Sequence, residues 1–435
     1  MTRSRPLPTP PSRPAKLWRD RGFSVFLTAQ TLSVAGDSFA LIAVPLLVLQ
    51  ATGSVAQMGL LTGAAGAAAV VAGIFAGILA DRLDRWILMA ACDLARMVLY
   101  GLIPLAWALH PEVWLLYVIL PLCAAIGMIF QVGYVTVVPA LSGPARITEA
   151  NGLLYGAASA AGIAGPLLAG LVSALLGPAG AIAVDAASFA ASAVGVLIVR
   201  HGLASRRLVV ADSGAPEVSV SASPAAAGPW REMLAGARFL WQHPVLRSLT
   251  ILLTFFIFAT EGLLDVLIYH LKHDLGQGDG VVGVVLAVAA LGTVAGALIV
   301  APLRRRLSFG ITWTGAVLLS ALAIAGLGAT GSVPPTAVLA ALYLGCASVA
   351  GIASMSLRQE VTPDHLLGRV TAAFWTIHFS LGPVGAALLT WTAAHYGVMA
   401  ACVASGVTCF FLGTIALVTP IRRPAPRPGV TAAGT

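Results

Sequence analysis

Charged residues are scarce in this chain. Asp, Glu, Lys and Arg make up 10% of the 435 residues, and 58% are hydrophobic. Soluble domains carry roughly 25% charged residues, so a soluble protein of this composition could not cover its surface. The mean hydropathy of +0.92 and recurring apolar runs of ~20 residues indicate a polytopic helical membrane protein. The continuous apolar runs lack the alternation that β-barrel strands need.

Cysteine motifs and catalytic signatures are missing as well. The five cysteines show no CxxC spacing, and Cys402 and Cys409 lie two helical turns apart, so we expect buried thiols without disulfides. His270 and His273 beside Asp274 could bind a metal, but a wetted helix end is the simpler interpretation. No nucleophile–His–acid set or Walker motif occurs. We therefore expect no enzyme, no catalytic, cofactor or metal site, and no ATP-driven pump.

Apolar runs divide the chain into twelve candidate spans. They lie at roughly 23–49, 54–79, 87–109, 113–138, 150–176, 179–199, 246–271, 280–302, 311–330, 335–357, 369–394 and 397–419. Nearly all of the 25 Lys and Arg residues then fall in loops and tails on one side. This asymmetry predicts that both termini are cytoplasmic. Because the basic residues form no single patch, it also argues against nucleic-acid binding.

The map predicts five regions. These are a cytoplasmic tail (1–21), a six-helix bundle (22–200), a cytoplasmic linker (201–244), a second six-helix bundle (245–420) and a cytoplasmic tail (421–435). From His201 to Gly228 the linker is rich in Ser, Ala and Pro. In its last part apolar residues recur at helical spacing: Trp230, Met233, Leu234, Ala237 and Trp241. This pattern predicts an amphipathic helix that lies on the inner membrane surface or binds a partner.

The two bundles resemble each other in sequence. An ungapped alignment that pairs Met58 with Val282 also pairs Asp37 with Glu261. A second echo relates Gly165–Ala169 to Gly382–Ala386. Internal repeats around a site at the bilayer midplane are typical of secondary transporters.

Acidic residues within spans are costly unless paired or hydrated. Asp37 and Glu261 occupy matched depths in the first and seventh spans, and Asp265 follows Glu261 by one turn on the same helix face. We expect these three carboxyls to line a cavity in which they exchange protons or attract a cation. The alternative is that Asp37 only hydrogen-bonds the backbone near Gly36.

Two further sites carry intramembrane charge. Asp93 and Arg96 have i, i+3 spacing, which predicts an ion pair within the third span, either a gate or a static pair. Asp185 has no partner nearby in sequence, and we expect a structural polar contact between helices.

The loop after the second span carries the sequence G-x-x-x-D-R-x-x-R at Gly77, Asp81, Arg82 and Arg85. This pattern resembles the signature loop of the major facilitator superfamily. The resemblance extends from about Gly22 to Pro420. It implies an all-α membrane protein with 12 transmembrane helices in two pseudo-symmetric six-helix bundles.

The resemblance also implies roles for individual residues. Asp81 would sit at the positive N-terminal end of the eleventh helix, near Arg369, and lock the outward-facing state, with support from Arg82 and Arg85. A partial match to the Gly-Pro signature of antiporters, with Ala169 where glycine is frequent, predicts a helix-five bend at Gly162, Gly165, Pro166 and Gly170.

Within the superfamily, the chain is similar to a drug-exporting branch that includes macrolide-efflux and enterobactin-exporter relatives. The similarity rests on Gln30–Ser33, Gly36–Asp37, Val44–Gln50, Asp81–Arg82 and Gly368–Val370 followed by Gly382–Pro383. It implies a monomeric, proton-driven exporter of amphipathic small molecules (drug, antibiotic or siderophore) in the cell membrane. An importer or uniporter with the same fold, a non-transporting receptor or scaffold, and an intramembrane enzyme are the alternatives.

Overall fold

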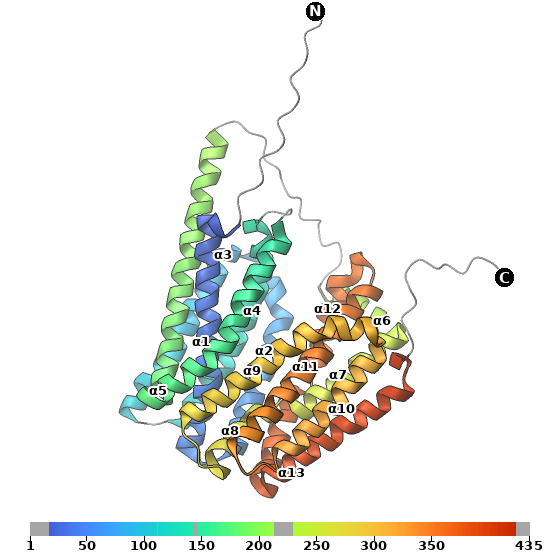
Figure 1. Ribbon diagram of the computed structural model, residues 1–435. Helices are drawn as coiled ribbons and strands as arrows, with labels where there is room; N and C mark the ends of the chain where they lie inside the picture. Colours follow the sequence, from blue (N-terminus) through green and yellow to red (C-terminus); the bar gives the residue numbers. More distant parts are fainter. Residues whose placement is uncertain (1–16, 111, 143–145, 213–228, 423–435) are drawn as a thin grey trace, which may run out of the picture.

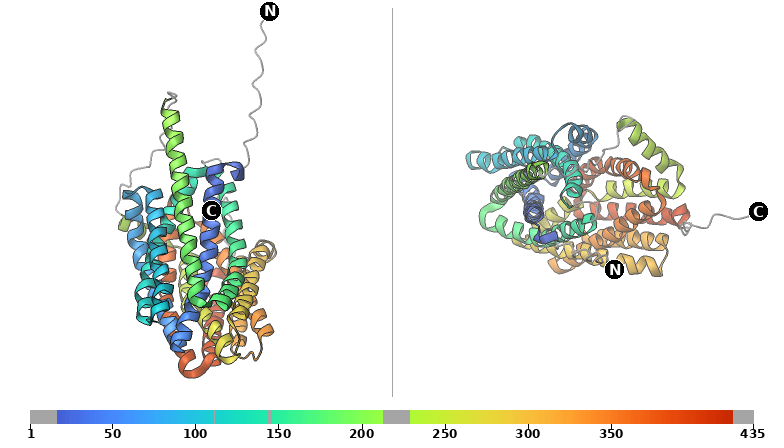
Figure 2. Two further views of the ribbon diagram at one scale, coloured as in Figure 1. Left: turned by 90° about the vertical axis from the view of Figure 1, so that its left-hand side faces the viewer. Right: turned by 90° about the horizontal axis from the view of Figure 1, so that it is seen from above.

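The computed structural model describes residues 17–110, 112–142, 146–212 and 229–422, and every regular element in these ranges is helical. Seen from above, the elements form two groups side by side (Figure 2). The first group, the N half, runs from blue to green in Figure 1. It comprises η1 (Leu17–Arg19), α1 (Arg21–Thr52), α2 (Val55–Arg82), α3 (Arg85–Leu109), α4 (Val113–Ser142) and α5 (Ile147–Asp212).

The second group, the C half, follows a short helix, α6 (Pro229–Gln242). It comprises α7 (Pro244–Thr260), α8 (Leu263–Tyr269), the π-helical η3 (His270–Asp274), α9 (Asp279–Arg306), α10 (Phe309–Leu327), α11 (Val333–Val361), α12 (Asp364–Phe379), α13 (Gly382–Val418) and η4 (Pro420–Arg422). It packs on the N half as a second bundle (Figure 1).

Glycine breaks and polar caps determine where the chain turns. Gly177 within α5 (φ 75°, ψ 166°) and Gly397 within α13 (φ 84°, ψ 162°) adopt backbone angles that only glycine accepts readily, so each long element is two helices joined at a reversal. At the charged loop, the Asp84 carboxylate caps α3 by accepting hydrogen bonds from the backbone N–H groups of Trp86 and Ile87.

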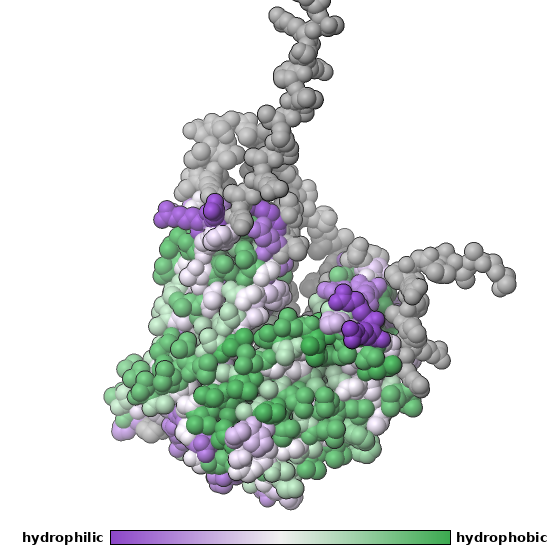
Figure 3. All heavy atoms as spheres, in the orientation of Figure 1, coloured by the Kyte–Doolittle hydropathy of each residue, from purple (hydrophilic) through white to green (hydrophobic). Residues whose placement is uncertain are grey.

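The twelve predicted spans are confirmed as helical crossings. Within the described ranges, ten stretches are long and apolar enough to cross a membrane, and the stretches that contain α5 and α13 each hold two crossings. Helices α7, α8 and η3 form the seventh crossing. In Figure 3 apolar side chains cover the flank of the molecule and hydrophilic ones gather toward its ends. Helix α5 continues to Asp212, beyond residue 201 where the linker was predicted to start.

The short helix of the linker packs on the C half. Leu240 is fully buried, whereas Leu234 and Trp241 remain more than half exposed. A Cβ atom at Gly236 would collide with the carbonyl group of Arg369, so α6 lies against the start of α12. The five cysteines are buried free thiols, as the sequence predicts.

The two halves touch mainly through small residues. With twelve crossings, the described chain begins and ends on the same side, which we call the terminal side. Near the start of α2, a Cβ atom at Gly63 would lie 2.7 Å from the Pro383 carbonyl oxygen. Gly170 of α5 contacts Gly283 of α9 just as closely. Both contacts lie away from the terminal side, and a hollow separates the halves toward it (Figure 3).

Candidate functional site

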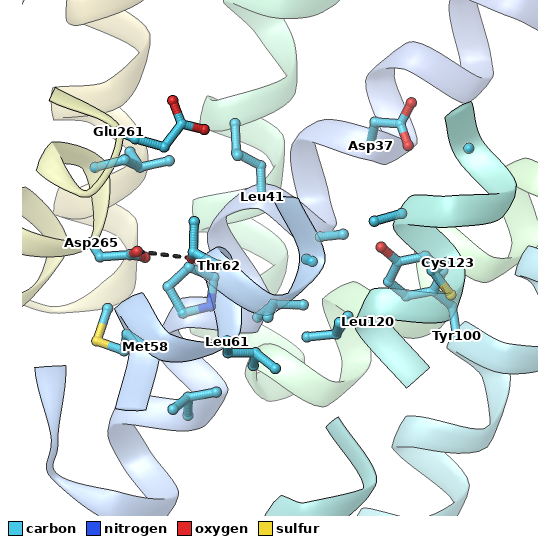
Figure 4. Close-up of a pocket in the computed structure, with 18 of the residues that line it drawn as sticks. Asp37, Leu41, Met58, Leu61, Thr62, Tyr100, Leu120, Cys123, Glu261 and Asp265 are labelled. Carbon is cyan, nitrogen blue, oxygen red and sulfur yellow. Dashed lines mark hydrogen bonds between the residues drawn. The ribbon is translucent and has the colours of Figure 1, made fainter. Parts of the chain in front are cut away.

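A cavity of about 360 Å³ lies between the two halves. It is mostly apolar, and polar groups reach it from both halves (Figure 4). The residues that line it include Asp37, Leu41, Met58, Leu61, Thr62, Arg96, Tyr100, Leu120, Cys123, Glu261, Leu264 and Asp265. An apolar chamber with a few polar groups is the usual form of a small-molecule site.

Asp37 projects from α1 into this cavity and binds Arg96 of α3. The Arg96 Nη2 atom donates a hydrogen bond to Asp37 Oδ1 at 2.6 Å. The Asp37 side chain is 47% exposed, so one face of this ion pair is open to the cavity. The predicted pairing of Arg96 with Asp93 is therefore wrong. Asp93 is fully buried, and neither of its carboxylate oxygens has a hydrogen-bond partner among the described residues.

Glu261 enters the cavity from the opposite half. It lies where α7 ends, two residues before α8 begins. It also lines an apolar pocket of about 370 Å³ that is formed mostly by the C half, with α1 and α5 of the N half completing its wall. Figure 4 shows Glu261 and Asp37 on opposite sides of the cavity. The structure thus places both members of the predicted pair at one chamber.

Asp265 joins the two halves directly. Thr62 of α2 donates a hydrogen bond from Oγ1 to Asp265 Oδ2 at 2.8 Å (Figure 4). Asp265 is 2% exposed, so this carboxylate is shielded on the closed side of the cavity. Sequence reasoning missed Thr62, because a threonine in an apolar helix carries no signal of a partner 203 residues away.

A second, more polar cavity of about 580 Å³ lies within the N half. It shares Asp37, Arg96 and Gly127 with the first cavity, so the ion pair stands between the two spaces. Its polar lining comes from Gln30, Thr31, Ser33, Gln131, Tyr134, Asn151 and Tyr155. Together the cavities can hold a molecule with one apolar and one hydrogen-bonding part.

The motif residues occupy the α2–α3 turn. Gly77, Asp81 and Arg82 fall in the last turns of α2, but their side chains lie outside the described residues, so the predicted contact of Asp81 with the eleventh helix stays a prediction. Arg85 is the first residue of α3 and is exposed.

The small residues of α5 have separate neighbours. Gly165 faces Ser38 of α1, Gly170 contacts α9, and Gly162 has open space around it. Backbone angles stay helical through Pro166, and the helix is interrupted at Gly177 instead.

Two further polar side chains, His270 and Arg358, are buried in the C half. His270 bridges Asp274 (2.8 Å from Nδ1) and the loop residue Thr330, and the described residues contain no group of three or more potential metal ligands. Arg358, in the last turn of α11, is 2% exposed, and its guanidinium lies 3.4 Å from the centroid of the Phe374 ring.

Comparison with known proteins now identifies the fold. The model of the Major Facilitator Superfamily matches residues 26–386. The chain belongs to this superfamily. Its members are transporters, so the protein is a multi-pass membrane transporter of small molecules rather than an enzyme.

Two relatives in the superfamily are exporters. The chain is 26% identical over 406 residues to the multidrug efflux pump Tap of Mycolicibacterium fortuitum, with 91% of this chain and 95% of the relative covered. It is 26% identical over 422 residues to the enterobactin exporter EntS of Escherichia coli, with 95% of each covered.

Solved structures share the same fold. A bacterial homologue of the human lysosomal transporter Spinster, in an inward-facing and unoccupied conformation, superposes with a TM-score of 0.68 at 14% identity, covering 92% of this chain and 97% of that one. The nucleoside transporter NupG gives a TM-score of 0.70 at 13% identity, covering 91% and 98%. The predicted two-bundle fold is therefore confirmed.

Proposed function

We propose that this protein exports amphipathic small molecules across the cell membrane in exchange for protons. The observation that carries the proposal is the cavity with ionisable groups from both halves, Asp37 with Arg96 on one side and Glu261 with Asp265 on the other. Intramembrane carboxyls at a solvated chamber are the usual proton carriers of transporters. The similarity to the two exporters favours outward transport.

The asymmetric cavity supports alternating access. With both termini in the cytoplasm, as the positive charge predicts, the structure corresponds to an inward-facing state. Substrate would enter from the cytoplasm through the hollow on the terminal side. Rocking of the halves would then separate the contacts at Gly63 and Gly170, break the Thr62–Asp265 hydrogen bond and bring the charged α2–α3 turn toward α12.

The residues that line the two cavities suggest which part of the substrate each cavity would bind. The apolar side chains of the first cavity would hold the hydrophobic body of the substrate, and the polar cavity of the N half its hydrogen-bonding groups. Protons would move inward through the sites of Asp37 and Glu261, entering from the outer side and leaving on the inner side. We expect a monomer to suffice, because one chain contributes the whole cavity, and we expect the proton gradient to replace any cofactor.

Transport in proteoliposomes tests the proposal. A substrate identified by a resistance and metabolite-export screen should move against its gradient when a pH gradient is imposed. Replacing Asp37 by Asn together with Glu261 by Gln should abolish gradient-driven flux. Replacing Glu112, an exposed residue of the α3–α4 loop, by Gln should preserve it. Unchanged flux in the double variant would refute the coupling role, and accumulation inside whole cells would favour an importer.

A further inference from the structure

The N half buries more acid than base. Asp37 of α1, Asp93 and Arg96 of α3, and Asp185 of α5 form a group that we call the charged cluster. It contains three carboxyls and one guanidinium. One arginine carries one positive charge and can neutralise only one of these acids. An ionised carboxylate without a partner inside a membrane protein is very costly, so the other two acids must carry protons.

Unused hydrogen-bonding atoms show how the cluster is divided. Arg96 donates a hydrogen bond from Nη2 to Asp37, and its guanidinium lies 3.9 Å from the centroid of the Phe189 ring. The buried Nε atom of Arg96 has no hydrogen-bond partner among the described residues. Asp93 and Asp185 are both 0% exposed. Neither oxygen of Asp93 and only one of Asp185 is engaged, the latter by the Ser188 hydroxyl at 3.3 Å.

Asp185 lies close to the Asp37–Arg96 pair. A Cβ atom at Gly36 would lie 2.7 Å from Asp185 Oδ1, so this carboxyl sits against α1 beside Asp37. Phe189 follows Asp185 by four residues and therefore shares its helix face. Arg96, which stacks on Phe189, is close enough to Asp185 for an electrostatic interaction. The guanidinium is thus bonded to one carboxyl that is open to the cavity and interacts electrostatically with a second carboxyl that is buried.

The surroundings of the cluster offer Asp185 no second cation among the described residues. The titratable groups near the two buried acids, besides Asp37 and Arg96, are Cys92 and Tyr100 of α3 and Cys123 of α4. Ser192 lies beside Asp93. Arg96 is therefore the group that can convert Asp185 from a neutral acid to a paired carboxylate.

We propose that Arg96 is a switch through which a cationic substrate bound at Asp37 expels a proton from Asp185. The cation takes over the Asp37 carboxylate and releases Arg96. The guanidinium turns to Asp185 and stabilises its carboxylate, and the O–H proton of Asp185 leaves to water in the cavity. One positive charge enters the cluster and one proton leaves, so its net charge is unchanged.

The reverse step resets the protein. When the cation departs on the outer side, Arg96 returns to Asp37 and Asp185 takes up a proton from that side. The structure, with Arg96 on Asp37, corresponds to the proton-loaded state without substrate. The switch predicts a substrate with one organic cationic group and exchange of one proton at the charged cluster per molecule.

This inference rests on the proposed function. Measuring the protons released when a cation binds tests the switch alone, because this measurement needs no transport. Tetraphenylphosphonium is a suitable probe because it is a permanent cation without a titratable proton, and triphenylphosphine oxide is its neutral analogue. Each is mixed with the purified full chain in weakly buffered detergent, while a pH dye reports protons and equilibrium dialysis reports binding. We expect one proton released per bound cation and none with the neutral analogue.

Variants identify the donor. Asp185→Asn should bind the cation and release no proton, whereas Asp93→Asn, an equally buried control, should release protons like the parent chain. Arg96→Gln should also bind without release, which keeps the test decisive if Asp185→Asn does not fold. Unaltered release in Asp185→Asn or Arg96→Gln, lost release in Asp93→Asn, or no binding of the cation to the parent chain would overturn the switch. Any of these results would leave the proposed proton-driven export unaffected, provided that the parent chain still showed gradient-driven flux in proteoliposomes.

Discussion

The contact between α5 and α9 leaves no room for a methyl group at Gly170. A Cβ atom there would lie 2.7 Å from the Gly283 Cα and 3.0 Å from the Asp279 carbonyl oxygen. Carbon atoms pack at about 3.5–4.0 Å, so the helices must separate by roughly 1 Å. Both neighbours are backbone atoms, which cannot rotate away. Overpacking of this kind costs about 1–3 kcal/mol.

Gly170→Ala should therefore disfavour the state in which this side is closed. A cost of that size shifts an equilibrium between two conformations by about 5- to 150-fold. Gly162→Ala is the matched control, because it lies in the same helix with no atom within 4 Å of the added carbon.

Spin labels at Glu112 and Gly331, in loops of opposite halves away from the terminal side, can report the shift. The distance between the two labels is longer when this side is open. Double electron–electron resonance should show a larger population at the longer distance in Gly170→Ala and the parental distribution in Gly162→Ala. Parental distances in Gly170→Ala, or equal shifts in both variants, would refute the assignment of this contact as the closed side.

Three further predictions concern other parts of the molecule. Thr62→Ala leaves the buried Asp265 carboxyl without its partner at a cost of about 1–3 kcal/mol, so the same spin labels should report opening, which Thr62→Ser should reverse. Gly177→Ala forces a side chain onto φ 75°, so the thermal midpoint in detergent should fall, by about 1–3 kcal/mol of stability. Burial lowers the pKa of His243, whose Nδ1 accepts a hydrogen bond from the Leu246 N–H group. Because the unfolded chain then binds the proton first, stability should decline as the pH falls below about 6.5, and His243→Asn should weaken this dependence.

Local signals in the sequence were sufficient for the outline of the fold. Apolar length predicts each crossing, and the reversals at Gly177 and Gly397 agree with the predicted breaks. The internal repeat placed Asp37 and Glu261 at matched depth, and the structure has both at one cavity. These predictions succeed because hydrophobic length and repeat symmetry are properties of the chain itself.

Partner choice could not be predicted in this way. The i, i+3 rule paired Arg96 with Asp93, since it considers one helix at a time. In the folded molecule Asp37 approaches Arg96 from a neighbouring helix and has access to the cavity, which favours an ion pair there. Arg358, in the last turn of α11, is buried against Phe374, a contact that no local rule predicts.

By itself, the sequence determined that this protein is helical, lies in a membrane and crosses it twelve times, because the cost of exposing polar backbone to lipid allows little else. Tertiary structure alone decided which side of the cavity is closed, that Thr62 bonds Asp265 across the halves, and which acid holds Arg96. Those outcomes depend on which helix faces meet in space, and Thr62 and Asp265, which meet there, lie 203 positions apart in the chain.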